Sequence, residues 1–336
     1  MDSITHIVLG AIVGEAMAGR REGKKALLWG ALAQSLPDID FIASAWMDTA
    51  HDVAAHRGIT HSILFVVVAA ALLAIGARRI HFHRPFTWKE GFLFFAVELF
   101  LHIFLDAFNA YGTGWWEPFS HYRISFNILF VADPFFSIWL GIAFLFLLIL
   151  KRSSRQRKFW VRFGLIASSC YLFYGVINKL RTDARVEKEL ARQQMVYTRY
   201  FTSPTPLNSW LWYVVVQDSS GYSIGYASVF DKNAAIDFHF FPRNDSLLAP
   251  FRGQEDVGEL LRFSQGYYTL DRWKDKVVFN DLRFGQMKGW EFPQAHFVFH
   301  YFLQAPGDNR VIVQRGRFAG WNLQTFQAFI KRIRGN

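Results

Sequence analysis

The sequence has almost no cysteine. Its single cysteine, Cys170, lies within an apolar run, so no disulfide can form within the chain and no thiolate metal site is expected. A P-loop, a glycine-rich dinucleotide motif and a Ser-His-Asp order are also missing, which disfavours nucleotide-binding folds and serine hydrolases. The start, "MDSITHIVLGAIVGEAMAG", lacks the basic segment of a cleavable signal peptide, and we expect a retained helix there.

The 336 residues are sufficient for two domains, and hydrophobic residues make up 52% of them. Apolar runs crowd the first 180 residues, whereas the remainder alternates polar and apolar residues as a soluble domain does. We therefore predict an all-α polytopic membrane domain over 1–180, a charged helix and linker over 181–208, and a soluble β-rich α+β domain over 209–336.

The membrane domain is expected to contain four to six transmembrane helices. Strong candidates are 62–77, 88–108 and 159–180, and a fourth segment, 128–150, is interrupted early by "DPFF". The shorter segments 3–18 and 24–36 form a partly inserted hairpin or two further crossings. The first short segment contains "GAIVG", a small-xxx-small pattern that lets helices approach closely.

Lysine and arginine predict the orientation of these helices. "GRREGKK", "ARRIHFHRPFTWK" and "KRSSRQRKFWVR" are strongly basic, whereas the alternate loops 37–61 and 109–127 contain one basic residue each, Arg57 and Arg123. This positive-inside bias places both termini and the C-terminal domain outside. The net charge of +10 therefore indicates topology, with membrane lipids as contacts and no nucleic acid as partner.

Ionisable residues gather at the predicted outer ends of the helices. Glu98, His102 and Asp106 are spaced four apart and share one helix face, where each charge costs about 2.5–3.5 kcal/mol near mid-bilayer. A divalent cation compensates such a stripe. The residues at the outer ends are His6, Asp38, Asp40, His56, His61, His102, Asp106 and Asp133.

Taken singly, these residues also have structural explanations. Asp133 before Pro134 is typical of a helix N-cap, "PDID" of a helix stop, and His56 with His61 of interfacial helix entry. Glu15 fits a contact with a neighbouring helix as well as a ligand. Convergence of several histidines and aspartates at one depth favours a metal site.

The blocks "THIVLGAIVGEA", "GALAQSLPDIDF", "HRGITHS" and "HIFLDAFNAYGTGWWEPFS" resemble the signatures of the YdjM-like inner-membrane metal-dependent hydrolases, over roughly residues 1–180. The resemblance implies a bacterial inner-membrane protein. It also implies metal ligation by His6, Asp38, Asp40, His56, His61, His102 and Asp106.

A weaker resemblance is to the zinc-dependent phospholipase C and S1/P1 nuclease group, which also has an early His, an Asp in a "PD" block and a His-x-x-x-Asp helix. That group's N-terminal Trp ligand and second His-x-x-x-Asp/Glu block are missing here, so we expect one or two ions. Histidine and carboxylate ligands suit Zn²⁺ first, then Mn²⁺ or Fe²⁺. Asp40 or Glu98 is the candidate general base, and Arg57 or Arg123 the candidate clamp for a phosphate or carboxylate.

The C-terminal region is expected to form strands at "WLWYVVVQD", "YSIGYASVF", "DFHFF", "KVVFNDLRFG", "HFVFHYFLQ" and "RVIVQRG", with helices near 254–263 and 321–333. Its histidines lack carboxylate partners in the pattern, so no second metal site is expected there.

The leading functional hypothesis is a membrane-bound, metal-dependent hydrolase acting on a phosphoester or lipid-linked substrate at the outer face. The alternative is a non-catalytic membrane protein with a structural metal and a partner-binding outer domain. A metal or proton transporter is disfavoured, because the ionisable residues cluster at one face instead of lining a path.

Overall fold

The chain divides into two compact units in a computed structural model that describes residues 1–79, 86–233, 235–305, 309 and 320–335. The first unit comprises residues 1–42 and 55–175, and the second comprises 43–54 and 176–336. The first is helical and the second contains the β-sheets, in agreement with the predicted order of fold classes.

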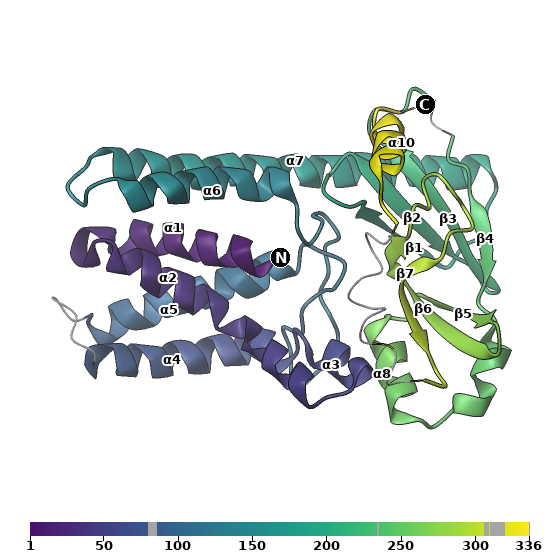
Figure 1. Cartoon of the computed structure of the whole chain (residues 1–336), viewed down its shortest axis with the longest axis horizontal. Coiled ribbons are helices and arrows are strands. Elements are labelled where there is room, and N and C mark those ends of the chain that lie inside the picture. Colours follow the sequence, from purple (N-terminus) through teal and green to yellow (C-terminus); the bar gives the residue numbers. More distant parts are fainter. Residues whose placement is uncertain (80–85, 234, 306–308, 310–319, 336) are drawn as a thin grey trace. The chain divides into compact units, whose positions relative to one another are not determined.

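Long helices form the first unit. They are α1 (Ser3–Glu22), α2 (Lys25–Ser35), α4 (Ile63–Arg79), α5 (Trp88–Asp106), α6 (Pro134–Ile149) and the first part of α7 (Gln156–Arg192). Two 3₁₀ segments, η1 (Pro37–Ala45) and η2 (Ile59–His61), and the short helix α3 (Thr49–Ala55) connect α2 to α4. α1 packs on α2, α5 and α6, and α4 packs on α5 (Figure 1).

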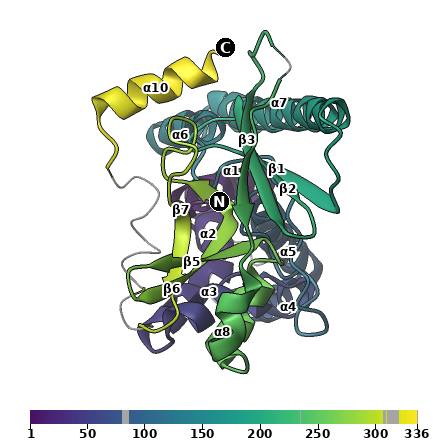
Figure 2. The same ribbon diagram turned by 90° about the vertical axis from the view of Figure 1, so that its right-hand side faces the viewer.

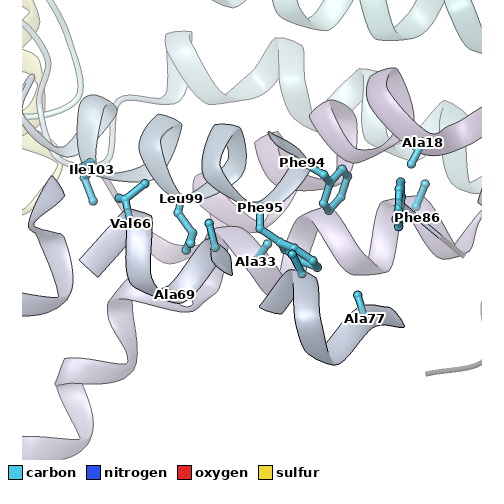
Figure 3. Packing of buried hydrophobic residues seen from close by; sticks show 13 residues of the cluster. Ala18, Ala33, Val66, Ala69, Ala77, Phe86, Phe94, Phe95, Leu99 and Ile103 are labelled. Carbon is cyan, nitrogen blue, oxygen red and sulfur yellow. The ribbon is translucent and has the colours of Figure 1, made fainter. Parts of the chain in front are cut away.

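Small residues let these helices pack closely. Alanines of α2 and α4, such as Ala33 and Ala69, lie against Leu99 of α5 in the buried core shown in Figure 3. A Cβ atom added at Gly10 or Gly14 would overlap a backbone carbonyl of α2. The small-xxx-small pattern is thus confirmed as a close helix–helix contact.

The two ends of the helical unit differ in chemistry. At one end, Arg152 donates to the carbonyl oxygens of Arg20 and Arg21, and Arg21 pairs with Glu90 at the start of α5. Two basic segments of the sequence therefore meet at this end, beside the start of α5. His6 near the start of α1 and Asp106 at the end of α5 lie at the other.

Among the described helices, α7 alone is long and apolar enough to cross a membrane by itself. The segment Thr49–His61 and the first part of α4 would make a second crossing if they formed one span with a 58° bend, and α6 is apolar but shorter. The four to six crossings expected from the sequence remain a prediction.

The second unit contains two antiparallel sheets (Figure 2). The first sheet has the order β1 (Arg199–Pro204), β2 (Leu211–Gln217), β3 (Gly221–Ser228) and β4 (His239–Pro242), and the second has the order β5 (Tyr268–Trp273), β6 (Lys276–Gln286) and β7 (Phe297–Phe302). η3 (Asp245–Phe251), α8 (Glu255–Phe263) and α10 (Leu323–Ile333) complete this unit.

Buried rings and branched side chains of both sheets share one core, which includes Tyr213, Ile224, Leu282 and Phe297. Two strands were not predicted. β1 occupies part of the expected linker, and β5 lies in a stretch rich in charge. The strand expected at 310–316 falls outside the described residues.

Candidate metal centre

Two histidines and two aspartates meet inside the helical unit. Their ligand atoms all lie within 4.8 Å of one another, and the residues are Asp38, His61, His102 and Asp106. η1 positions Asp38 and η2 positions His61. The i, i+4 spacing on α5 places His102 and Asp106 on one face, as the sequence predicted.

The spacing of the four ligand atoms suits a metal ion. Ligands about 2.0–2.2 Å from a tetrahedral zinc lie about 3.3–3.6 Å from one another. Nε2 of His61 lies 3.2 Å from Nε2 of His102 and 3.3 Å from Oδ2 of Asp106. The distances from Oδ1 of Asp38 to His102 and His61 are 3.4 and 3.7 Å, and His102 lies 3.5 Å from Oδ2 of Asp106. These five distances are close to those expected for a tetrahedral site, and the four residues Asp38, His61, His102 and Asp106 are called the cage from here on.

The hydrogen bonds behind the two histidines direct their free electron pairs into the cage. Nδ1 of His102 donates to the backbone oxygen of Gln34 at 2.5 Å. The Thr60 hydroxyl donates to Asp40 at 3.1 Å, so its oxygen is free to accept from Nδ1 of His61 at 3.0 Å. With each proton held on Nδ1, a neutral ring presents Nε2 as an acceptor, which is the form that binds metal.

The two carboxylate oxygens of Asp106 have different surroundings. Oδ1 contacts the amino group of Met1, Nη2 of Arg57 at 3.0 Å and Nε2 of His6 at 3.1 Å. Oδ2 is buried and has no hydrogen-bond partner, although it faces both cage histidines. A buried, unpartnered carboxylate oxygen is costly unless a cation satisfies it.

Asp38 is the accessible member of the cage. Its side chain is 16% exposed, whereas those of His61, His102 and Asp106 are fully buried. Oδ1 of Asp38 faces Nε2 of His102 at 3.4 Å and Nε2 of His61 at 3.7 Å. An aspartate carboxyl is ordinarily ionised at neutral pH, so Asp38 is available as an anionic ligand.

The other three residues implied as ligands surround the cage. His6 stacks on His102 with ring centroids 3.8 Å apart, and contacts Asp106. Asp40 accepts hydrogen bonds from the Arg57 backbone at 2.8 Å and from His56 at 3.1 Å. Burial raises the pKa of Asp40, and His56 with its other neighbours lowers it further than burial raises it. These contacts make His6, Asp40 and His56 supports of the cage in this structure.

The candidate base and clamp residues occupy separate places. Glu98 is fully buried one turn below His102, beside Gly30 and outside the four-residue group. Arg57 is buried, donates to Asn109 at 2.8 Å and holds Asp106. Arg123 donates to the backbone oxygen of His56 at 2.8 Å. The general-base and clamp assignments remain predictions. The contacts of Arg57 are with Asn109 and Asp106 inside the helical unit.

For Asp133 and Glu15 the sequence left open a structural role or a role as ligand, and the structure shows the structural contact in both cases. Asp133 accepts from the backbone nitrogen of Phe135 at 2.9 Å and precedes Pro134, which confirms the N-cap. Glu15 forms a two-pronged ion pair with Arg157 at 2.7 and 2.8 Å, which confirms the contact with a neighbouring helix.

Gln34 and Thr60 were not predicted from the sequence. Gln34 contributes its backbone oxygen to His102 and its side-chain oxygen, at 3.4 Å, to His6. The one signal for Gln34 was a polar side chain within an otherwise apolar helix directly before "PDID". Thr60 could have been suspected as the neighbour of His61.

The helical unit therefore contains, at one end, a candidate metal centre made of two aspartates and two histidines. The model of the YdjM inner membrane protein family matches residues 1–182, more than half of the chain. The chain therefore belongs to this family of inner membrane proteins.

The chain is also similar to two individual proteins, one of which is an inner membrane protein. The uncharacterized protein YfhP of Bacillus subtilis (strain 168) is 26% identical over 349 residues, which cover 96% of this chain and 95% of YfhP. The inner membrane protein YbcI of Escherichia coli (strain K12) is 30% identical over 126 residues, which cover 36% of this chain and 69% of YbcI. No solved structure matches the chain significantly.

Proposed function

We propose that this protein is a metal-dependent hydrolase of the bacterial inner membrane, acting on a phosphoester or lipid-linked substrate at the outer face. The observation that carries the proposal is the cage of Asp38, His61, His102 and Asp106, with its unpartnered oxygen on Asp106. Zn²⁺ is the first choice of ion, and Mn²⁺ or Fe²⁺ suit the same donors. The proposed number of ions is one or two, because His6 lies beside Asp106 and could be a ligand of a second ion.

When bound, the ion supplies Lewis acidity and a water activated near neutral pH. The chain's own residues prepare that site. Gln34 and Thr60 hold the protons of the two histidines on Nδ1, and Arg57 holds Asp106 in position. Access is expected on the side of Asp38, because the other three side chains are fully buried.

The proposal includes the finer topology. The basic segments that contain Arg20, Arg21 and Arg152 meet at one end of the helical unit and the cage lies at the other. This separation supports an inner position for the basic end and an outer position for the cage. Six crossings by α1, α2, α4, α5, α6 and α7 would then place the second unit outside the cell membrane.

A specific observation favours the alternative of a structural metal. Four protein ligands fill a tetrahedron, and closed tetrahedra are typical of structural zinc. The hydrolase proposal requires a position for water, through a sixfold-coordinated ion or through expansion to five ligands.

Metal analysis and hydrolysis assays on one preparation separate the two functions. The purified chain, loaded with Zn²⁺ or Mn²⁺, should cleave bis-(p-nitrophenyl) phosphate or a phospholipid in mixed micelles, and His102→Ala should abolish both metal binding and cleavage. His121→Ala is the matched control, since this exposed histidine pairs with Glu117 away from the cage. Stoichiometric metal without cleavage of either substrate would favour the structural function.

A further inference from the structure

The second unit contains a cavity of ≈ 520 Å³, here named the inter-sheet cavity. Residues of β4 in the first sheet and of β5, β6 and β7 in the second sheet line it, together with the segment 294–296. Its size falls within the range of about 300–1,000 Å³ typical of small-molecule sites. Neither the metal cage nor the proposed hydrolysis uses this cavity.

Aromatic rings form much of the wall. The indole of Trp273 stacks on the ring of His296, with centroids 4.4 Å apart and planes 11° apart, and His300 follows at 5.9 Å. Phe241 and Phe297 meet edge to face at 5.3 Å. Rigid rings of this kind provide apolar contact area at little cost in side-chain entropy.

Two of the polar groups that line the cavity are acceptors with lone pairs free for a ligand. His300 is 6% exposed and donates from Nδ1 to the Phe297 backbone oxygen at 3.1 Å, which leaves Nε2 as an acceptor. Asp271 accepts from Nδ2 of Asn280 at 2.7 Å and has lone pairs to spare. Asn280, which is 5% exposed, is fixed by a second hydrogen bond to Thr269 at 3.3 Å. A ligand rich in hydroxyl donors suits this set.

The rim adds positive charge. Arg272 and Lys274 both line the cavity and are exposed. Against the single carboxylate of Asp271 they give the cavity a net positive charge, which favours a ligand with an acidic substituent.

We propose that the inter-sheet cavity binds a pyranose ring of a glycan. Aromatic rings of the wall, Trp273 among them, contact the apolar face of the sugar, and its hydroxyl groups donate to Asp271 and His300. An acidic group on the same or the next sugar lies against Arg272 and Lys274. A donor-poor apolar ligand would leave Nε2 of the buried His300 without a partner, and that loss disfavours it.

The test uses the full chain in detergent and two soluble probes, a hyaluronan tetrasaccharide with acidic sugars and the neutral chitotetraose. Saturation-transfer NMR and calorimetry should detect binding of the acidic probe at millimolar or tighter affinity, at least threefold tighter than the neutral one. The difference should shrink in high salt, because screening weakens the contribution of Arg272 and Lys274.

Variants locate the binding. Trp273→Ala and Asp271→Ala should each weaken binding at least tenfold, while Asp237→Ala should not, because Asp237 is exposed, pairs with His239 and does not line the cavity. Unchanged circular dichroism and melting temperature will show that the variants are folded, and Trp273→Phe should restore part of the affinity if a variant at this position melts early. Absence of binding of both probes, or equal binding by Asp271→Ala and Asp237→Ala, would overturn the proposal.

Discussion

Nε2 of His61 and Nε2 of His102 lie 3.2 Å apart, and an oxygen behind each ring is placed to accept the proton of the other nitrogen. Two neutral rings in this arrangement direct lone pairs at each other, with carboxylate oxygens of Asp38 and Asp106 beside them. Such a group of acceptors repels itself without a cation. The arrangement is therefore the strongest physical argument for a metal in this helical unit.

The close contact between α1 and α2 should be sensitive to a single methyl group. Gly14→Ala places a Cβ against the Ala26 carbonyl, and overpacking of this kind costs about 1–3 kcal/mol. The matched control is Gly141→Ala in α6, where nothing lies within 4 Å of the added Cβ and alanine favours a helix over glycine. Thermal unfolding in detergent should show a lower melting temperature for the first variant alone. Equal melting temperatures would mean that the helices do not approach as described.

Arg57 should support the metal through Asp106. Arg57→Ala removes its guanidinium from Oδ1 of Asp106, and loss of such outer-sphere partners typically weakens metal affinity about 10- to 100-fold. Arg123→Ala, in the loop 109–127, should leave metal affinity within about twofold, since Arg123 donates to the His56 backbone oxygen. Competition with a fluorescent zinc chelator gives both values. Unchanged metal affinity in Arg57→Ala, with weaker binding of a phosphoester, would instead support the clamp assignment.

The orientation of the helical unit can be tested with a membrane-impermeant thiol reagent. In a Cys170→Ser background, Ser120→Cys and Ser219→Cys should react in spheroplasts, whereas Ser153→Cys should react only after lysis. All three serines are exposed, so access to the side chain itself does not limit the reaction. Labelling of Ser153→Cys in intact spheroplasts without labelling of Ser120→Cys would invert the topology and place the cage on the inner side.

Local sequence patterns predicted the parts of the structure that depend on local geometry. The i, i+4 spacing of His102 and Asp106 requires only a helix. The N-cap at Asp133 is also local. These features follow from helix periodicity and end chemistry without knowledge of the packing.

Features that depend on two distant segments were less accessible. The backbone oxygen of Gln34 reaches His102 across 68 positions of sequence, and no residue pattern encodes a backbone contact of that range. Asp38 and Asp40 are two residues apart, yet only Asp38 belongs to the cage, whereas Asp40 binds the Arg57 backbone beside it. The turn of η1 separates them, and "PDID" alone cannot indicate which carboxylate faces inward. β5 escaped prediction because its last three residues are exposed.

The central claim is that Asp38, His61, His102 and Asp106 together bind one divalent ion. Elemental analysis of the purified chain, dialysed and then reloaded with Zn²⁺, measures this directly, with His61→Ala, His102→Ala and the exposed-histidine variant His121→Ala in parallel. We predict at least one equivalent of metal in the parent and in His121→Ala, and less than about a tenth of that in the two cage variants, together with a melting temperature that added Zn²⁺ raises only where the cage is intact. Full metal content in His61→Ala or His102→Ala would contradict the account.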